Sequence, residues 1–155
     1  MIAKLIDSIS ENDKEKIILE TVLLPRKIFL LDCEFTEPPK PKFLIFVGIF
    51  EESTPLFIVI NSKVHTLIEN NPDLRICQVK MKSSEYEFLD YDSFANCADV
   101  IDSFDIQEII NQISDNPDID KGMITQDTIK KIRNVVKRAK TISSIYKECI
   151  LGYLK

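Results

Sequence analysis

The sequence predicts an α+β fold, in which a small, strongly bent antiparallel sheet or barrel carries helices at both ends. About five or six short strand-like runs are separated by tight turns, and not by the roughly 10–15-residue helices that link the strands of a parallel sheet. Helical patterns precede and follow these runs. The chain has 155 residues, of which 45% are hydrophobic and 29% charged, as expected for one ordinary globular unit.

The first segment, residues 1–24, is predicted to be helical. Apolar residues recur there at helical spacing, at Ile2, Leu5, Ile6 and Ile9. Pro25 ends the helix, because proline has no N–H to donate and its ring clashes with the preceding turn. We therefore divide the chain into an N-terminal helical segment, 1–24, and a barrel domain with a basic C-terminal helix, 25–155.

Runs rich in β-forming residues predict the strands of the barrel. The predicted strands are 27–32, 42–50, 56–60, 74–81 and 86–89, with short extended pieces at 100–104 and 122–124. The sequence PPKP at 38–41 predicts a loop between the first two strands, because proline cannot donate within a sheet. A short helical turn is expected at 64–69, and a turn or short helix at 92–93. The phenylalanines in these strands are predicted to pack in the core.

The helices that follow are predicted from apolar faces and from N-cap residues. Asp105 is expected to cap a helix whose isoleucines, at 106, 109, 110 and 113, share one face. Thr125 is expected to cap a second helix, in which apolar residues alternate with lysine and arginine. Either Ser143 or Ser144 begins a last short helix.

The charge of the chain is distributed unevenly. Residues 1–128 hold 12 Lys/Arg against 24 Asp/Glu, a net charge of −12, whereas residues 129–155 hold 8 against 1, a net charge of +7, giving −5 for the whole chain. The cations of the predicted helix are candidate binding residues for an anionic partner: Lys130, Lys131, Arg133, Lys137 and Arg138. A solvated helix face is the commonest explanation of such a run.

Several classes of site are disfavoured by composition. Three glycines are too few for most glycine-rich phosphate loops, and neither a P-loop nor a G-x-S-x-G motif occurs. The four cysteines (Cys33, Cys77, Cys97 and Cys149) and His65 form no closely spaced pairs, so we predict reduced, mostly buried thiols, with no metal and no cofactor.

The location of the protein is predicted from what the sequence lacks. No run approaches the roughly 18 apolar residues of a membrane span, and the start of the chain has no secretory apolar core. We therefore expect a cytoplasmic protein that makes no membrane contact.

Five segments occur in an order shared with a known family. They are KIFLLDCEF (27–35), PPKPKFLIFVGI (38–49), LFIVINS (56–62), YDSFANCADVIDSF (91–104) and KGMITQDTIKKI (121–132). In this order they resemble the MazF/PemK family of toxin proteins, whose fold is a small SH3-like barrel. The last segment fits the family pattern most closely. The resemblance implies an SH3-like barrel here.

The resemblance also implies an activity and a site. Members of the family are typically metal-independent endoribonucleases that small antitoxin proteins hold inactive, and many act as homodimers. Lys42, or Lys40, stands where the family has its catalytic arginine, and Asn61–Ser62 stands where the family has its catalytic threonine or serine. In a mechanism that forms a cyclic phosphate, the cation stabilises the phosphorane and the hydroxyl positions or relays a proton, with Asn61 orienting these groups or donating to the oxyanion.

Two other functions are open on the sequence. A catalytically inactive barrel can act as a protein-interaction module, holding a partner in its groove or along the basic helix 129–138, in a toxin–antitoxin or phage-defence setting. Alternatively, the basic helix contacts RNA or another nucleic acid directly.

Overall fold

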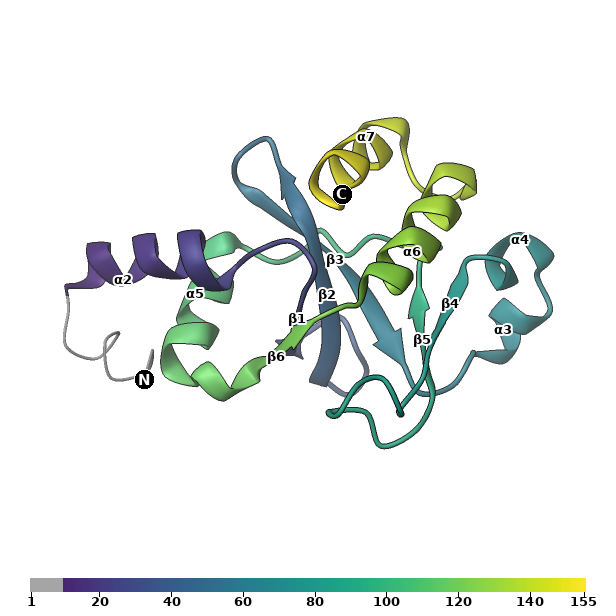
Figure 1. Ribbon diagram of the computed structural model, residues 1–155, viewed down its shortest axis with the longest axis horizontal. Helices are drawn as coiled ribbons and strands as arrows, with labels where there is room; N and C mark the ends of the chain where they lie inside the picture. Colours follow the sequence, from purple (N-terminus) through teal and green to yellow (C-terminus); the bar gives the residue numbers. More distant parts are fainter. Residues whose placement is uncertain (1–9) are drawn as a thin grey trace.

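The computed structural model describes residues 10–155 and confirms the α+β class (Figure 1). Six antiparallel strands form one strongly curled, half-barrel sheet in the order β4-β5-β3-β2-β1-β6, with helices at both ends of the chain. The part of the predicted first helix that contains Ile2, Leu5, Ile6 and Ile9 lies outside the described residues.

The strands are β1 (Lys27–Cys33), β2 (Lys40–Phe50), β3 (Thr54–Asn61), β4 (Gln78–Met81), β5 (Ser93–Asn96) and β6 (Asp120–Met123). The α-helices are α2 (Glu11–Ile17), α3 (Thr66–Glu69), α4 (Pro72–Arg75), α5 (Ile106–Asp115), α6 (Gln126–Arg138) and α7 (Ser144–Tyr153). A π-helical turn, η1 (Ile18–Val22), continues α2, and a 3₁₀ turn, η2 (Pro117–Ile119), follows α5.

Both faces of the sheet are covered, which explains why β2 and β3 are apolar almost throughout. Side chains alternate between the two faces of a strand. Ile45 and Ile58 belong to one core cluster, together with Ile132 of α6. Phe46 and Phe57 belong to the other cluster, which includes the buried isoleucines of α5 and of η1. Helices from the two ends of the chain therefore stabilise opposite faces of the sheet.

The predicted caps are confirmed. The side chains of Asp105, Thr125 and Ser143 accept hydrogen bonds from backbone N–H groups in the first turns of α5, α6 and α7. The central strand phenylalanines are buried as expected, whereas Phe35, just beyond β1, is 43% exposed.

Two predictions for the region between β3 and β5 are wrong at the level of single elements. The strand predicted over 74–81 begins only at Gln78, because Asn71 caps α4 and Pro72 occupies its first turn, which draws Leu74 into a helix. Residues 86–89 form turns instead of a strand. There the Tyr86 hydroxyl lies 2.6 Å from the hydroxyl of Thr128 on α6.

Two further expectations are corrected nearby. Residues 92–93, expected as a turn or a short helix, lead into β5, which begins at Ser93. The extended piece at 100–104 contributes a single bridge, between Ile101 and Phe57. No helix in the described part of the chain is both long enough and apolar enough to span a membrane.

Candidate functional site

The end of the β2–β3 pair brings together the three residues predicted to be catalytic. The antiparallel register pairs Phe43 with Ile60, so Lys42 and Asn61 come next on the two strands. The Lys42 ammonium donates to the Asn61 Oδ1 atom at 2.8 Å. Ser62 follows immediately after β3. The Asn61 side chain thereby holds the lysine in place, and its amide NH₂ is left to donate elsewhere.

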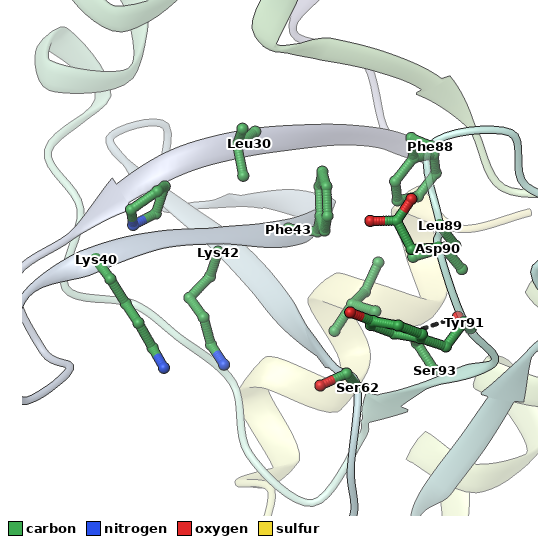
Figure 2. Close-up of a pocket in the computed structure, with 12 residues that line it drawn as sticks. Leu30, Lys40, Lys42, Phe43, Ser62, Phe88, Leu89, Asp90, Tyr91 and Ser93 are labelled. Atoms are coloured by element: carbon green, nitrogen blue, oxygen red, sulfur yellow. Dashed lines mark hydrogen bonds between the residues drawn. The ribbon is translucent and has the colours of Figure 1, made fainter.

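Lys42 and Ser62 line an open groove of about 260 Å³, together with Lys40 (Figure 2). Figure 2 shows the two lysine side chains leaving β2 in the same direction, with the Ser62 hydroxyl and the Tyr91 ring on the other side of the groove. Among the described residues that line this groove, Asp90 supplies the one carboxylate. We call this cavity the lysine groove.

The electrostatics of the lysine groove favour an anion. Burial lowers the pKa of Lys42 below the usual lysine value, and the neighbouring Lys40 ammonium lowers it further. Within residues 10–155, neither lysine forms an ion pair. Two neighbouring ammonium groups without ion-pair partners repel each other, and a bound anion such as a phosphate reduces this repulsion.

The Cys33 thiol and the His65 ring, two groups that can act as nucleophiles, are held inert or are used elsewhere. Burial raises the pKa of the Cys33 thiol to about 11, although Lys42 acts in the opposite direction. The thiol is therefore neutral at neutral pH, and a neutral thiol is a poor nucleophile. The His65 Nδ1 atom accepts from the Leu67 N–H as the cap of α3.

The opposite wall of the lysine groove was not assigned to the site from the sequence. The ring of Phe88 packs on Phe43 with centroids 4.7 Å apart, which fixes the wall against β2. Tyr91 is 66% exposed, and its backbone carbonyl accepts from the Ser93 hydroxyl at 3.0 Å. The sequence signal for this wall is Tyr91 between Asp90 and Asp92, because an aromatic residue flanked by two carboxylates is expected at the surface.

The loop behind Tyr91 is held by Asp92. Its carboxylate accepts from the backbone N–H of Ser83 at 2.9 Å and lies 3.6 Å from the Lys80 ammonium. The hydrogen bond from Ser83 is the main cause that lowers the pKa of Asp92. Asp92 is therefore used to position the loop, whereas Asp90 points into the groove (Figure 2).

The structure places Arg133, one of the five basic residues predicted on the last long helix, in an internal contact. Its Nη1 atom donates to the carbonyl oxygen of Leu151 at 2.6 Å and also to that of Leu154. These carbonyls lie at the end of α7, where the helix leaves backbone acceptors without partners. Arg133 therefore joins α6 to the end of α7.

The other four cations of α6 are spread over its exposed surface. Lys131 pairs with Asp127 at 3.1 Å, one turn earlier on the helix. The side chain of Arg138 returns to the carbonyl of Asn134 at 3.3 Å. Lys130 and Lys137 are exposed, and their ammonium groups have no partner within residues 10–155. Arg138 lines a small cavity with Cys77 and Val135, whereas Lys40 and Lys42 line one groove together.

Within residues 10–155, no group of three or more Cys, His, Asp or Glu side chains is placed so that it could hold a metal ion. No model of a known protein family matches the chain. No curated protein matches it either. The resemblance to the MazF/PemK family thus rests on the order of the segments alone and stays a prediction.

Proposed function

We propose that the chain is a MazF/PemK-like toxin-type protein that cleaves single-stranded RNA in the lysine groove. The observation that supports this proposal is the pair of uncompensated cations, Lys40 and Lys42, beside the Ser62 hydroxyl. The cations stand out because residues 1–128 have a net charge of −12. A groove that retains two positive charges on an acidic body is suited to one phosphate and its immediate neighbours.

The arrangement supplies each group that an internal cleavage of RNA needs. The ribose 2′-oxygen attacks the adjacent phosphorus, the bond from phosphorus to the 5′-oxygen breaks, and the products carry a 2′,3′-cyclic phosphate and a 5′-hydroxyl. Lys40 and Lys42 stabilise the charge that develops on the non-bridging oxygens. The Ser62 hydroxyl and the free NH₂ of Asn61 donate to the same oxygens and orient them.

Two proton transfers complete the reaction. The Asp90 carboxylate accepts the proton of the attacking 2′-hydroxyl. The leaving 5′-oxygen takes a proton from Lys42, whose lowered pKa makes the ammonium a better acid than an ordinary lysine. Asp90 takes one proton and Lys42 gives one, so the proton transfers balance without a metal-bound water.

Tyr91 suits the groove to a single strand. Its ring is 66% exposed beside the cations. Bases stack on such rings when they are not paired in a duplex, and the contact is tolerant of sequence. A flanking base stacked on Tyr91 would hold the strand while the phosphate lies against the lysines.

The test is inducible expression of the wild type beside Lys42→Met and Ser62→Ala, with Lys130→Met as a matched control on the exposed face of α6. We expect growth arrest and discrete RNA fragments ending in cyclic phosphates from the wild type and from Lys130→Met. The two groove variants should leave RNA intact while keeping the circular dichroism spectrum of the folded protein. Intact RNA in cells that contain folded wild-type protein would contradict the nuclease proposal.

The second candidate is a catalytically inactive barrel that holds a protein partner in the same groove. Lysine favours it over catalysis in one respect, because a lysine lacks the planar fork with which arginine grips two phosphate oxygens. Under this proposal, expression leaves growth and RNA unchanged, and a small antitoxin-like protein or a second copy of the chain co-purifies. Loss of that partner on Lys42→Met would place it in the lysine groove.

A further inference from the structure

Two of the four cysteines stand opposite each other in the hairpin that β4 and β5 form at one end of the sheet (Figure 1). The register pairs Gln78 with Asn96, and Cys77 and Cys97 are the next residues outward on the two arms. The backbone N–H of Cys97 donates to the carbonyl oxygen of Cys77 at 2.9 Å, so the antiparallel pairing continues to these residues. Cys77 and Cys97 therefore form the last cross-strand pair at the open end of the hairpin.

Both thiols lie on the same face of the hairpin. Side chains two positions apart along a strand share a face, which places Cys77 with Val79 and Cys97 with Ala95. Val79 pairs with Ala95, and all four residues are buried in one core cluster. Residues in a hydrogen-bonded antiparallel pair have Cα atoms about 5.5 Å apart, and a disulfide spans Cα distances of about 4.4–6.8 Å. The pairing of the two strands therefore gives the backbone spacing that a disulfide needs.

The two thiols are free in the structure and lie close to each other. Burial raises the pKa of Cys97, and the neighbouring Cys77 raises it further. The Cys77 Sγ atom donates to the carbonyl oxygen of Asp73 at 3.3 Å. An S–H group is a weak donor, so little is lost when this bond breaks. A change of rotamer at Cys77 can therefore turn its sulfur towards Cys97.

Cys77 is the thiol that a small oxidant can reach. It borders a cavity of about 130 Å³, whose other lining residues are Ile76, Val135 and Arg138. A water molecule takes up about 30 Å³ in the liquid, and hydrogen peroxide is little larger, so the cavity has room for it. Burial and Asp73 raise the pKa of the Cys77 thiol, whereas Lys147 acts in the opposite direction. We therefore expect a slow first oxidation, at Cys77 and not at the fully buried Cys97.

We propose that Cys77 and Cys97 are a redox site, which a peroxide converts into a disulfide across the open end of the β4–β5 hairpin. The Cys77 thiolate attacks one peroxide oxygen and the O–O bond breaks, which leaves a sulfenic acid and a hydroxide that takes up the thiol proton as water. The Cys97 sulfur then attacks the Cys77 sulfur and the S–O bond breaks. The departing hydroxide takes the Cys97 proton as a second water, so two thiols are oxidised while one peroxide is reduced to two waters.

The disulfide restrains the wall of the lysine groove. The loop of the hairpin, residues 82–92, carries Phe88 and Tyr91. A covalent bond at the open end keeps β4 from separating from β5, so it suppresses the openings in which this loop takes part. The bond also closes a loop of about 20 residues, which limits the conformations of the unfolded chain. The redox site follows from the backbone pairing and does not depend on whether the groove cleaves RNA.

The test is oxidation of the folded full chain with hydrogen peroxide, followed by alkylation of the remaining thiols and digestion without reduction. Mass spectrometry should find peptides joined through Cys77 and Cys97, with Cys33 and Cys149 alkylated, and dithiothreitol should separate the joined peptides. Cys97→Ala should instead leave a sulfenic acid at Cys77 that dimedone traps. Cys149→Ala is the matched control and should still form the disulfide.

The outcomes distinguish the disulfide from its effect on the groove. We expect the oxidised chain to melt about 5 °C higher than the reduced chain, and amide exchange in 82–92 to slow about threefold. The redox site is refuted if peroxide leaves both thiols open to alkylation, joins them only in urea, or joins either of them to Cys33 or Cys149. If the disulfide forms and exchange in 82–92 is unchanged, its restraint of the groove wall is refuted.

Discussion

The chain has two basic regions, and they differ in how their charges are used. Helix α6 carries five cations in thirteen residues, whereas the lysine groove has only Lys40 and Lys42. Yet Arg133 is engaged with the end of α7, and Lys131 pairs with Asp127. The two groove lysines line one open cavity, and neither forms an ion pair within the described residues.

The difference shows that the density of charge along a sequence does not locate a binding site. A helix distributes successive side chains around its axis, so a run of lysines seldom converges on one point. Two lysines separated by one residue on a strand point to the same face. A ligand that needs several cationic donors at one point should therefore bind the lysine pair of β2 more tightly than the cations of α6.

The largest expected difference between the two regions is in catalysis. Replacing Lys42 by Met removes the charge that stabilises the phosphorane, and we expect the rate of RNA cleavage to fall by roughly 10²–10³-fold, or about 3–4 kcal/mol. Lys137→Met, on exposed α6, should change that rate by less than about twofold. Single-turnover cleavage of a defined RNA measures both. Equal losses in the two variants would mean that α6 belongs to the active surface.

Stability should show the reverse order. Arg133→Met leaves the carbonyls of Leu151 and Leu154 without their donor, and we expect the free energy of unfolding to fall by about 2–3 kcal/mol. Arg138→Met, a matched change on the exposed surface of the same helix, should cost under about 0.5 kcal/mol. Urea denaturation followed by circular dichroism gives both values. An unfolding free energy for Arg133→Met within error of the wild type would show that the contact with α7 adds nothing to stability.

The sequence predicted most of the fold because its signals there are local. The caps Asp105, Thr125 and Ser143 follow from hydrogen bonds within one turn, and the first three strands follow from β-forming runs. The failure at 74–81 is also local, because the Asn71 cap and Pro72 start a helix within the strand-like run, whereas the failure at 86–89 depends on a distant partner. Tyr86 forms hydrogen bonds with Thr125, which caps α6, and with Thr128 of α6, a contact that no pattern near residue 86 reveals.

The candidate site was predictable in part for a similar reason. Lys42 and Asn61 were named from the resemblance, and the β2–β3 register brings them within hydrogen-bond distance. Tyr91 was missed because the wall to which it belongs depends on how a turn region folds back against β2. The contact between Asp32 of β1 and Gln112 of α5 could not be predicted, because the two residues are separated by 80 positions in the sequence.

The smallest effect in this comparison is a shift in titration, and it tests the electrostatic argument directly. The pKa of Lys42 is lowered in the folded chain, first by burial and then by Lys40. Its charged form therefore costs stability at neutral pH, and this cost disappears as the pH rises through the folded-state pKa. In a protein labelled with ¹³C at lysine Cε, we expect the Lys42 signal to titrate at a lower pH than is usual for a lysine.

Two perturbations should move that titration upward for different reasons. Lys40→Met removes the like charge, so the pKa of Lys42 rises, although burial still holds it below the usual value. Methyl phosphate, bound by the wild type, should raise it further, because an anion stabilises the ammonium. If methyl phosphate changes the chemical shifts of the α6 lysines as much as that of Lys42, the anion is attracted to the chain in general and does not bind specifically in the lysine groove. If methyl phosphate changes the signal of Lys42 alone, the lysine groove binds the anion and the cations of α6 do not.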